Sequence, residues 1–278
     1  MSSIKIMPIK HYRKVEEENV IISNDVELVP GEICFTESGK DAMRQIADYH
    51  ELQREDEVYI VTSSDSPFVS SCVTSTLFNF CKVSRVLTEK TKLIFVIHEF
   101  GMPCNTIDSL ALIAMDRGIP LVEDVAHSMT SRFNGRLLGS WGDYVIHSLP
   151  KSLPVAKGGI LIKSSVRYTP KFNECGSSKD EFHKYRGLLA WARDKRREQY
   201  EMYRRLCSKS LVYGELGGAT PFCFGYIDSP EIVKKIYEKA ESEKIELLRT
   251  HNPCWVTIPL NPWFSRGDLK RIVNHIKG

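Results

Sequence analysis

An amine, a carboxylate and a turn suited to phosphate stand out in the first half of the chain. Asp124 is the last residue of the candidate strand 120–124, which reads P-L-V-E-D. Ser38 and Gly39 lie between a short candidate strand and the start of a helix, where the first backbone amides have no helical partner and can bind a phosphate. Lys151 lies in a proline-flanked segment, seven residues before a glycine pair. These groups can act together only if the fold brings them to one place.

The surrounding pattern predicts a parallel sheet that does so. Residues 93–97 are apolar and largely β-branched without alternation, as in a strand covered on both faces. A helix follows, with Asn105 or Thr106 as its cap and Gly118 at its end. Together with the strand 120–124 this makes a βαβ unit, which implies parallel strands. Ligands bind outside the carboxyl ends of such strands, where Asp124 lies.

The rest of the chain extends this α/β pattern. Further strands are predicted at 33–36, 58–61, 160–162 and 255–260, and further helices at 40–51, 181–206 and 266–276, the last capped by Ser265. The polar stretch after residue 162, with Pro170 and Gly176, is the best candidate for a domain linker. We therefore expect a larger α/β domain at 1–165 and a smaller C-terminal α+β domain at 166–278.

The chemistry of the three groups indicates pyridoxal 5'-phosphate (PLP). A lysine amine can condense with the aldehyde of this cofactor and, once displaced, can move a substrate proton. A carboxylate beside the pyridine nitrogen keeps that nitrogen protonated, so that the ring can accept electrons. Each residue alone is weak evidence, because strand-end aspartates commonly form turns and lysines are commonly solvated. In combination they predict Lys151 and Asp124 as catalytic residues.

The segment 96–161 resembles the nucleotide-sugar aminotransferases of the DegT/StrS type. It reads, in order, V-I-H-E-F-G-M-P, L-V-E-D-V-A-H-S, G-S-W-G-D-Y and K-S-L-P-V-A-K-G-G-I-L. The family shows H-x-x-G, an E-D-x-A-[QH] strand end, a G-S-x-G-D turn, and a lysine seven and eight residues before Gly-Gly. Outside this segment, 38–42 resembles its S-G-T-x-A phosphate loop, 66–69 its T-[FWY]-V segment, and 256–276 its closing strand and helix.

The resemblance implies a compact PLP-dependent enzyme of fold type I. Such enzymes have a large PLP-binding domain with a mainly parallel sheet, a smaller C-terminal domain, and a homodimer with active sites near the interface. Lys151 would form the covalent link to the cofactor, and Asp124 would lie at the pyridine nitrogen. The other implied contacts are His127 beside the 3-oxygen of the cofactor, Phe68 against its ring, and Ser38, Gly39 and Ser148 at its phosphate.

The sequence departs from the family pattern near the expected phosphate. Lys40 replaces the threonine of the phosphate loop, and its charge can either serve the phosphate or face solvent. The family's serine lies five residues before the lysine, whereas Ser148 lies three before Lys151, so His147 competes for this place. The chain is also shorter than family members usually are, and its shortened part includes the region where the family supplies an asparagine from the neighbouring subunit.

The predicted function is transfer of an amino group from L-glutamate to a nucleotide-linked keto-sugar, for surface polysaccharide or other glycoconjugate biosynthesis. Two alternatives remain open. The shortness of the chain and its altered phosphate loop fit a non-catalytic relative that acts as a partner or regulatory subunit. A PLP-dependent sugar dehydratase is the other alternative, but the relatives with that activity typically lack the lysine, so Lys151 favours transamination.

Composition excludes several other classes. The net charge of +3 on 278 residues gives no reason to expect nucleic acid or a membrane surface, and no run reaches the roughly 18 to 20 apolar residues of a membrane span. Eight dispersed cysteines, without zinc spacing, predict reduced thiols in a cytoplasmic protein and no metal site. The basic segment 193–205 is interleaved with glutamate and tyrosine and predicts a solvated helix face, with a diphosphate contact as the alternative. P-loop and G-x-S-x-G motifs are absent.

Overall fold

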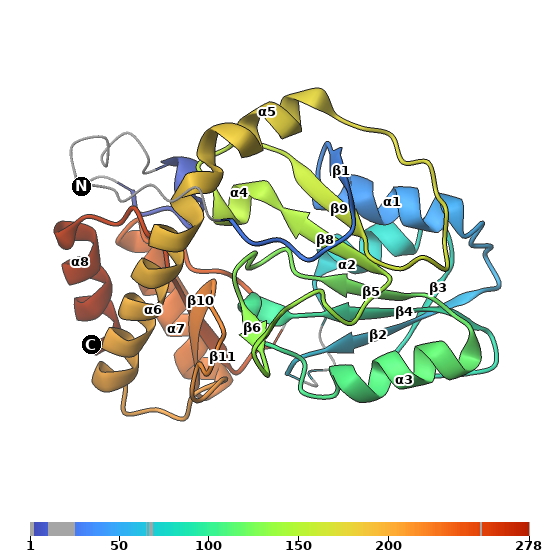
Figure 1. The fold of residues 1–278 in the computed structure, drawn as a ribbon. Coiled ribbons are helices and arrows are strands. Elements are labelled where there is room, and N and C mark those ends of the chain that lie inside the picture. The colour runs from blue at the N-terminus through green and yellow to red at the C-terminus, as the bar shows by residue number, and fades with distance from the viewer. Residues whose placement is uncertain (1–2, 11–25, 65, 67–68, 251, 278) are drawn as a thin grey trace.

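A large sheet with helices on both faces forms one side of the molecule, and a small sheet with its own helices forms the other (Figure 1). The computed structural model describes residues 3–10, 26–64, 66, 69–250 and 252–277. The predicted contact of Phe68 with the cofactor ring therefore lies outside the described residues.

The large sheet has seven strands in the order β1-β9-β8-β5-β4-β2-β3. Only β9 runs against its neighbours, and the remaining pairs are parallel, which confirms the mainly parallel sheet expected from the sequence. The strands are β1 (Glu32–Thr36), β2 (Glu57–Thr62), β3 (Lys82–Ser84), β4 (Thr91–Ile97), β5 (Leu121–Asp124), β8 (Tyr144–Ser148) and β9 (Gly159–Lys163).

Eight α-helices and two short antiparallel pairs complete the described part of the chain. The helices are α1 (Gly39–Tyr49), α2 (Ser71–Leu77), α3 (Ile107–Arg117), α4 (Leu149–Ser152), α5 (Gly176–Tyr185), α6 (Leu189–Leu206), α7 (Pro230–Ser242) and α8 (Arg266–Lys277). The pairs are β6 (Arg132–Phe133) with β7 (Arg136–Leu137), and β10 (Cys223–Ile227) with β11 (Trp255–Pro259).

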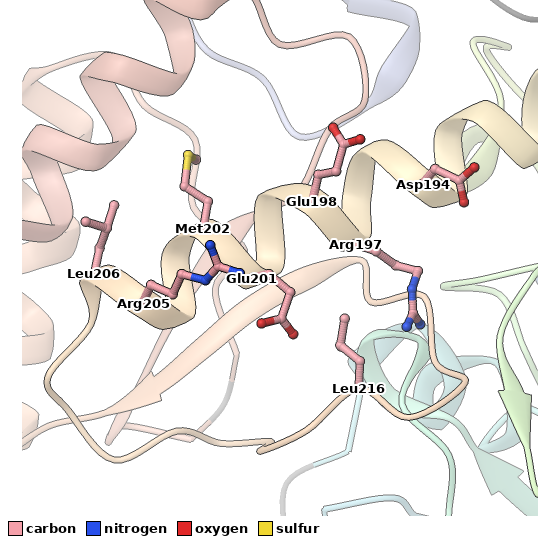
Figure 2. A pocket seen from close by; sticks show the side chains of 8 residues that line it. All are labelled: Asp194, Arg197, Glu198, Glu201, Met202, Arg205, Leu206 and Leu216. Atoms are coloured by element: carbon pink, nitrogen blue, oxygen red, sulfur yellow. The ribbon is translucent and has the colours of Figure 1, made fainter.

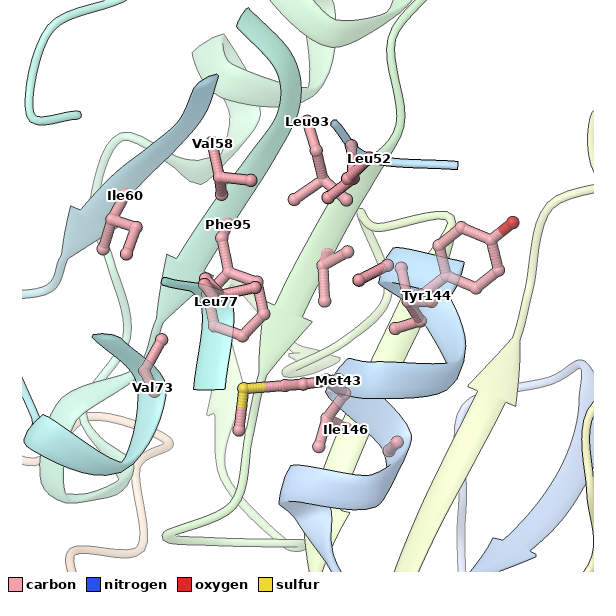
Figure 3. Close-up of a cluster of buried hydrophobic side chains, with 14 of the residues drawn as sticks. Met43, Leu52, Val58, Ile60, Val73, Leu77, Leu93, Phe95, Tyr144 and Ile146 are labelled. Carbon is pink, nitrogen blue, oxygen red and sulfur yellow. The ribbon is translucent and has the colours of Figure 1, made fainter. Parts of the chain in front are cut away.

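One face of the large sheet packs against α1 and α2. Figure 3 shows Met43 of α1 and Val73 of α2 facing strand residues such as Val58, Phe95 and Ile146, all of them buried. Because successive strand residues point to opposite faces, the alternate residues of the same strands form separate clusters with α3 and with α5. Burial of each large apolar side chain stabilises the fold by about 1.5 to 3 kcal/mol, so the sheet is held from both sides.

The second half of the chain builds a separate core around β10 and β11. Tyr200 and Tyr203 of α6 pack their rings edge-on against Phe224 of β10. The N-terminal Ile4 is fully buried in this core and bridges to Ile245. The division into domains at 1–165 and 166–278 stays a prediction.

The structure corrects one predicted element and adds others. The single helix expected at 181–206 is wrong, because α5 begins at Gly176 and a 3₁₀ turn at Arg186–Leu188 separates it from α6. Glycine at position 187 is a poor helix former and allows this break. Strands β8 and β10 and helix α7 were not predicted. No helix in the described residues is long and apolar enough to cross a bilayer.

Candidate active site

The expected functional residues gather at one edge of the large sheet. Strands β1, β2, β4, β5 and β8 run in the same direction, so their carboxyl ends share this edge. Ser38 follows β1, Asp124 ends β5, and Lys151 follows β8. Ligands of parallel sheets bind at this edge. The topology therefore brings the amine, the carboxylate and the candidate phosphate turn to one rim.

The turn before α1 offers unpaired backbone amides. The Ser38 hydroxyl accepts a hydrogen bond from the Asp41 amide (3.1 Å), and the Ser38 carbonyl accepts one from the Ala42 amide (3.1 Å). Among the described residues, the Gly39 and Lys40 amides have no acceptor at this helix start. Two free donors at a positive helix end suit an anion such as phosphate.

Gly159 and Ser148 lie directly against this turn. A Cβ atom placed on Gly159 would lie 2.6 Å from the Ser38 carbonyl carbon and 2.8 Å from the Gly39 nitrogen. A Cβ atom on Gly39 would lie 3.8 Å from the Ser148 Cβ. Only glycine at position 159 lets β9 approach the turn so closely. We name Ser38, Gly39 and Ser148 the candidate phosphate turn.

Strand alternation separates Ser148 from its competitor His147. Ile146 belongs to the cluster on the α1 face of the sheet, whereas Val145 belongs to the cluster on the opposite face. Ser148 shares the face of Ile146, and His147 shares the face of Val145. His147 is buried there, with 2% of its surface exposed. The side chain of Ser148 is thus the one next to the start of α1.

Lys151 lies in the short helix α4, with its amine facing a histidine. Its Nζ is 3.2 Å from His127 Nε2, while the Phe100 amide donates to His127 Nδ1 (3.2 Å). Because Nδ1 accepts, the proton of the neutral ring is on Nε2, and that N–H can donate only to an uncharged amine. Burial lowers the pKa of Lys151, although the charge of Asp124 opposes the shift. Contact geometry and electrostatics thus both favour a neutral, nucleophilic lysine.

Aromatic rings hold His127 in place. The Phe222 ring stacks on it with centroids 5.2 Å apart, and the Phe100 ring contacts it at 5.8 Å. Phe100 has a φ of 55°, a left-handed backbone conformation that is rare for a bulky residue and costs about 1 to 3 kcal/mol. The residue in this conformation is the one whose backbone amide donates to His127 Nδ1. Burial lowers the pKa of His127 well below its ordinary value, and the charges of Lys151 and Arg196 lower it further.

Asp124 presents a buried carboxyl group at the end of β5. One oxygen, Oδ1, accepts a hydrogen bond from the Ala126 amide (2.9 Å), and only 7% of the residue is exposed. Burial raises the pKa of Asp124, while the charge of Lys151 opposes that shift. The mutual influence of Asp124 and Lys151 on their pKa values places the two groups within electrostatic range of each other.

The neighbouring Glu123 has a structural role that the sequence reasoning missed. Its carboxylate accepts hydrogen bonds from the amides of Gly139, Trp141 and Gly142 at 2.6 to 2.9 Å, and from His98 Nε2 at 2.9 Å. Both Glu123 and His98 are fully buried. The E-D, H-x-x-G and G-S-x-G-D motifs therefore meet at one carboxylate, which fixes the end of β5 that carries Asp124.

The surroundings of the site leave room for a ligand. A depression of about 780 Å³ is lined by Ser148, Pro150, Lys151 and Val155, together with Met7 and Ile9 from the N-terminal segment. Lys40 is exposed at the start of α1, and its charge contributes to lowering the pKa of Lys151. Lys40 therefore faces solvent while still acting on the site electrostatically.

Helix α6 contributes a residue that the sequence analysis placed in solvent. Figure 2 shows side chains that line a pocket beside α6, among them the acidic Glu198 and Glu201 and the basic Arg197 and Arg205. The pocket has a volume of about 600 Å³. This mixed face agrees with a solvated helix surface. Arg196 is the exception, because it is only 3% exposed and donates a hydrogen bond to the Lys151 carbonyl.

The burial of Arg196 was readable from spacing. Arg196, Gln199, Tyr200 and Tyr203 follow the i, i+3, i+4, i+7 pattern of one helix face, and all four are buried. The many charged residues between them led to the prediction of a solvated helix instead of a buried face. No cluster of three or more His, Cys, Asp or Glu in the described part of the chain could hold a metal, and the eight cysteines are free thiols.

Known proteins resemble this chain in sequence and in fold. A model of the DegT/DnrJ/EryC1/StrS aminotransferase family matches residues 60–205. The uncharacterized protein MJ1066 of Methanocaldococcus jannaschii is 27% identical over 118 residues, and the match covers 41% of this chain but only 30% of that protein.

Two solved structures match much more of the chain. The aminotransferase TlmJ from Streptoalloteichus hindustanus has a TM-score of 0.74 at 14% identity, over 88% of this chain and 84% of its own. The PLP-form of Spr1654 from Streptococcus pneumoniae has a TM-score of 0.74 at 15% identity, and the match covers 99% of this chain and 98% of that protein. These likenesses confirm the predicted fold class, the fold of PLP-dependent aminotransferases.

Proposed function

The chain belongs to the DegT/DnrJ/EryC1/StrS aminotransferase family, and on that premise we propose that it is a PLP-dependent aminotransferase. The observation that supports this proposal most strongly is the presence of both Lys151 and Asp124 at the carboxyl edge of the sheet. Lys151 presents its amine to a histidine that can only donate to it, and Asp124 presents a buried carboxyl group within electrostatic range.

The residues at this edge fit PLP at three points. The Gly39 and Lys40 amides and the Ser148 side chain would hold the phosphate, since this is where the helix start lacks acceptors. Asp124 would face the pyridine nitrogen. The Oδ2 atom of Asp124 accepts no hydrogen bond from the described residues. Because a buried carboxylate is costly without a partner of opposite charge, the protonated pyridine nitrogen would stabilise it. His127 Nε2 would lie near the 3-oxygen, where its N–H can donate.

PLP, when bound, supplies an electron-accepting ring that stabilises negative charge on the substrate carbon. Lys151 provides the nucleophilic amine, and the same Nζ moves the proton at the carbon that carries the amino group. Asp124 would keep a proton at the pyridine nitrogen of the bound cofactor. The Glu123 network keeps Asp124 at the rim without taking part in the chemistry.

Cofactor binding tests this assignment directly. We expect the purified protein to show a visible absorption band from bound PLP, and Lys151→Ala to lack that band. Lys157→Ala is the matched control, because Lys157 is exposed in the same segment and has no partner in the site. A wild-type protein that takes up no PLP, or a Lys151→Ala protein that keeps the band, would contradict the proposal.

The amino donor and acceptor are the finer part of the proposal. We assign L-glutamate as donor and a nucleotide-linked keto-sugar as acceptor, for surface polysaccharide or glycoconjugate biosynthesis in the cytoplasm, by a homodimer. Family membership supports an amino acid and a sugar as substrates. L-Glutamate should bleach the visible band and release 2-oxoglutarate, and a keto-sugar nucleotide should restore the band. A band unchanged by glutamate excludes this donor.

Lys151 also separates the alternatives. A non-catalytic relative would bind no PLP, and its protein would be colourless. A sugar dehydratase would bind PLP but would consume a sugar nucleotide without any need for glutamate. The presence of the lysine amine next to His127 favours transamination over both.

A further inference from the structure

Arg196 is a buried cation without a carboxylate partner. Its guanidinium donates from Nη2 to the Lys151 carbonyl oxygen and lies over the Phe222 ring, with Cζ 5.3 Å from the ring centroid. Its Nε has no acceptor, and no carboxylate among the described residues lies within ion-pair distance of Arg196. Burial lowers the pKa of Arg196 to about 10, so the group remains charged at neutral pH. Buried charges are normally paired, so an unpaired one requires a reason.

The contacts of Arg196 lead to the reactive amine by two routes. The first is the backbone, because the carbonyl that Arg196 binds belongs to Lys151 itself. The second is a stack of rings, because Phe222 lies against Arg196 and against His127, whose Nε2 faces the Lys151 amine. Helix α6 thus contacts the lysine from the second half of the chain.

From this geometry we infer that Arg196 is a positioning residue, which anchors the α4 turn and keeps His127 uncharged as a hydrogen-bond donor toward the Lys151 amine. The inference rests on the proposed PLP chemistry for its functional meaning, but its geometry concerns residues of this chain alone. A neutral lysine is required for attack on an aldehyde, and a protonated His127 would lose the acceptor that the Phe100 amide needs.

The charges around the amine agree with this role. Besides His127, the groups that influence Lys151 come from four other elements: Asp124 of β5, Cys72 of α2, Cys223 of β10 and Lys40 of α1. Burial raises the pKa of the Cys223 thiol, so that group is neutral. Asp124 is the one carboxylate in this set, and its charge opposes the effect of burial on the pKa of Lys151. Burial is the main cause that lowers the pKa of both Lys151 and His127, and the charge of Arg196 lowers the pKa of His127 further.

Two measurements test the inference on the full-length protein. The first is the ¹⁵N NMR titration of the His127 ring without added PLP. Wild type should show a neutral ring with its proton on Nε2 and a depressed pKa. Arg196→Met should raise the His127 pKa by about one unit, since it removes a nearby cation. Arg196→Lys keeps the charge and should leave the His127 pKa close to the wild-type value.

The second measurement is the rate at which cofactor-free protein forms the visible band with added PLP. Arg196→Met should slow this rate about tenfold, as expected when an anchor worth one charge-assisted hydrogen bond is lost. Arg197→Met is the matched control, because the neighbouring Arg197 also binds backbone carbonyls, those of Gly217 and Ala219, away from Lys151. It should change neither the titration nor the rate.

Several outcomes would overturn the inference. An unchanged His127 pKa in Arg196→Met would show that the guanidinium is merely structural, and equal effects in Arg197→Met would point to helix α6 in general. If Arg196→Met does not fold, the wild-type titration and Arg196→Lys still decide, because a His127 ring with its proton on Nδ1 could not donate from Nε2 to the Lys151 amine. A wild type that takes up no PLP would refute the proposed function while leaving the His127 titration as a valid test.

Discussion

Gly159→Ala should weaken binding of the cofactor phosphate without touching the reactive lysine. The added Cβ would lie 2.6 Å from the Ser38 carbonyl carbon and from Thr36 Oγ1, whereas ordinary contacts begin at 3.4 Å. Strand β9, at Gly159, and the candidate phosphate turn, at Ser38, must therefore separate by about 0.8 Å. The backbone of Gly159 is not in the left-handed region, so alanine causes no conformational strain there. The perturbation is purely steric and acts on the start of α1.

The displacement is large on the scale of a hydrogen bond. A donor moved by 0.8 Å from an ideal N···O distance of about 2.9 Å no longer bonds the same oxygen. Hydrogen bonds to a charged group contribute about 1.5 to 3 kcal/mol each, so loss of one amide contact should weaken PLP binding roughly ten- to hundredfold. Overpacking should also lower the free energy of unfolding by about 1 to 3 kcal/mol.

A comparison of PLP with pyridoxal isolates the phosphate contribution. Titrations followed by the visible band should show a PLP affinity reduced at least tenfold in Gly159→Ala, and an affinity for pyridoxal, which lacks the phosphate, that stays near the wild-type value. Gly176→Ala is the control, because a Cβ there meets no atom within 4 Å. If Gly159→Ala weakened both ligands equally, or neither, the phosphate would not bind at this turn and the assignment would be wrong.

Three further predictions follow from the same contacts. Asp124→Asn should keep the visible band but slow transfer of the amino group at least about a hundredfold, because the pyridine nitrogen loses its proton; near-normal single-turnover rates would refute this role. Glu123→Gln should lower the free energy of unfolding, measured in urea, by about 2 to 4 kcal/mol. The NH₂ group of the glutamine would face backbone amides that donate to the carboxylate in the wild type, so donors would meet donors. A loss below about 1 kcal/mol would argue against the buried network. Burial lowers the pKa of Lys151, so the rate of PLP capture should increase with pH as the amine loses its proton. The rate should level off at a lower pH than for a free lysine side chain. A midpoint at or above the ordinary lysine pKa would contradict the neutral amine.

The sequence was sufficient where elements have uninterrupted apolar runs. The strand at 93–97 and the helix that ends at Gly118 were predicted and are present, because β-branched runs and a glycine in the left-handed conformation are strong local signals. Strand β8 was missed because two of its five residues are the polar His147 and Ser148, which shorten the apolar run. Polar residues at the end of a strand can serve a binding site, and they weaken the apolar pattern from which the strand would be predicted.

Contacts between distant segments could not be predicted in the same way. Arg196 is 45 positions from Lys151, and arginine is rarely buried, so its neighbours in sequence indicated a solvated helix. The helical spacing of Tyr200 and Tyr203 marks the buried face, but spacing does not reveal which residue that face will contact. Only the packing of α6 against the α4 turn places the guanidinium at the lysine.

The adjacent acids Glu123 and Asp124 show how a strand divides scaffold from chemistry. Successive strand residues point to opposite faces, so Glu123 follows Leu121 toward the α3 side and Asp124 follows Val122 toward the α1 side. On one side a carboxylate receives four hydrogen bonds and is fully satisfied. On the other side, Asp124 accepts one hydrogen bond, from the Ala126 amide to Oδ1, and its Oδ2 is left for a ligand. A shift of β5 by one residue would exchange these roles, so the Glu123 network, by fixing the strand, also determines which acid reaches the cofactor.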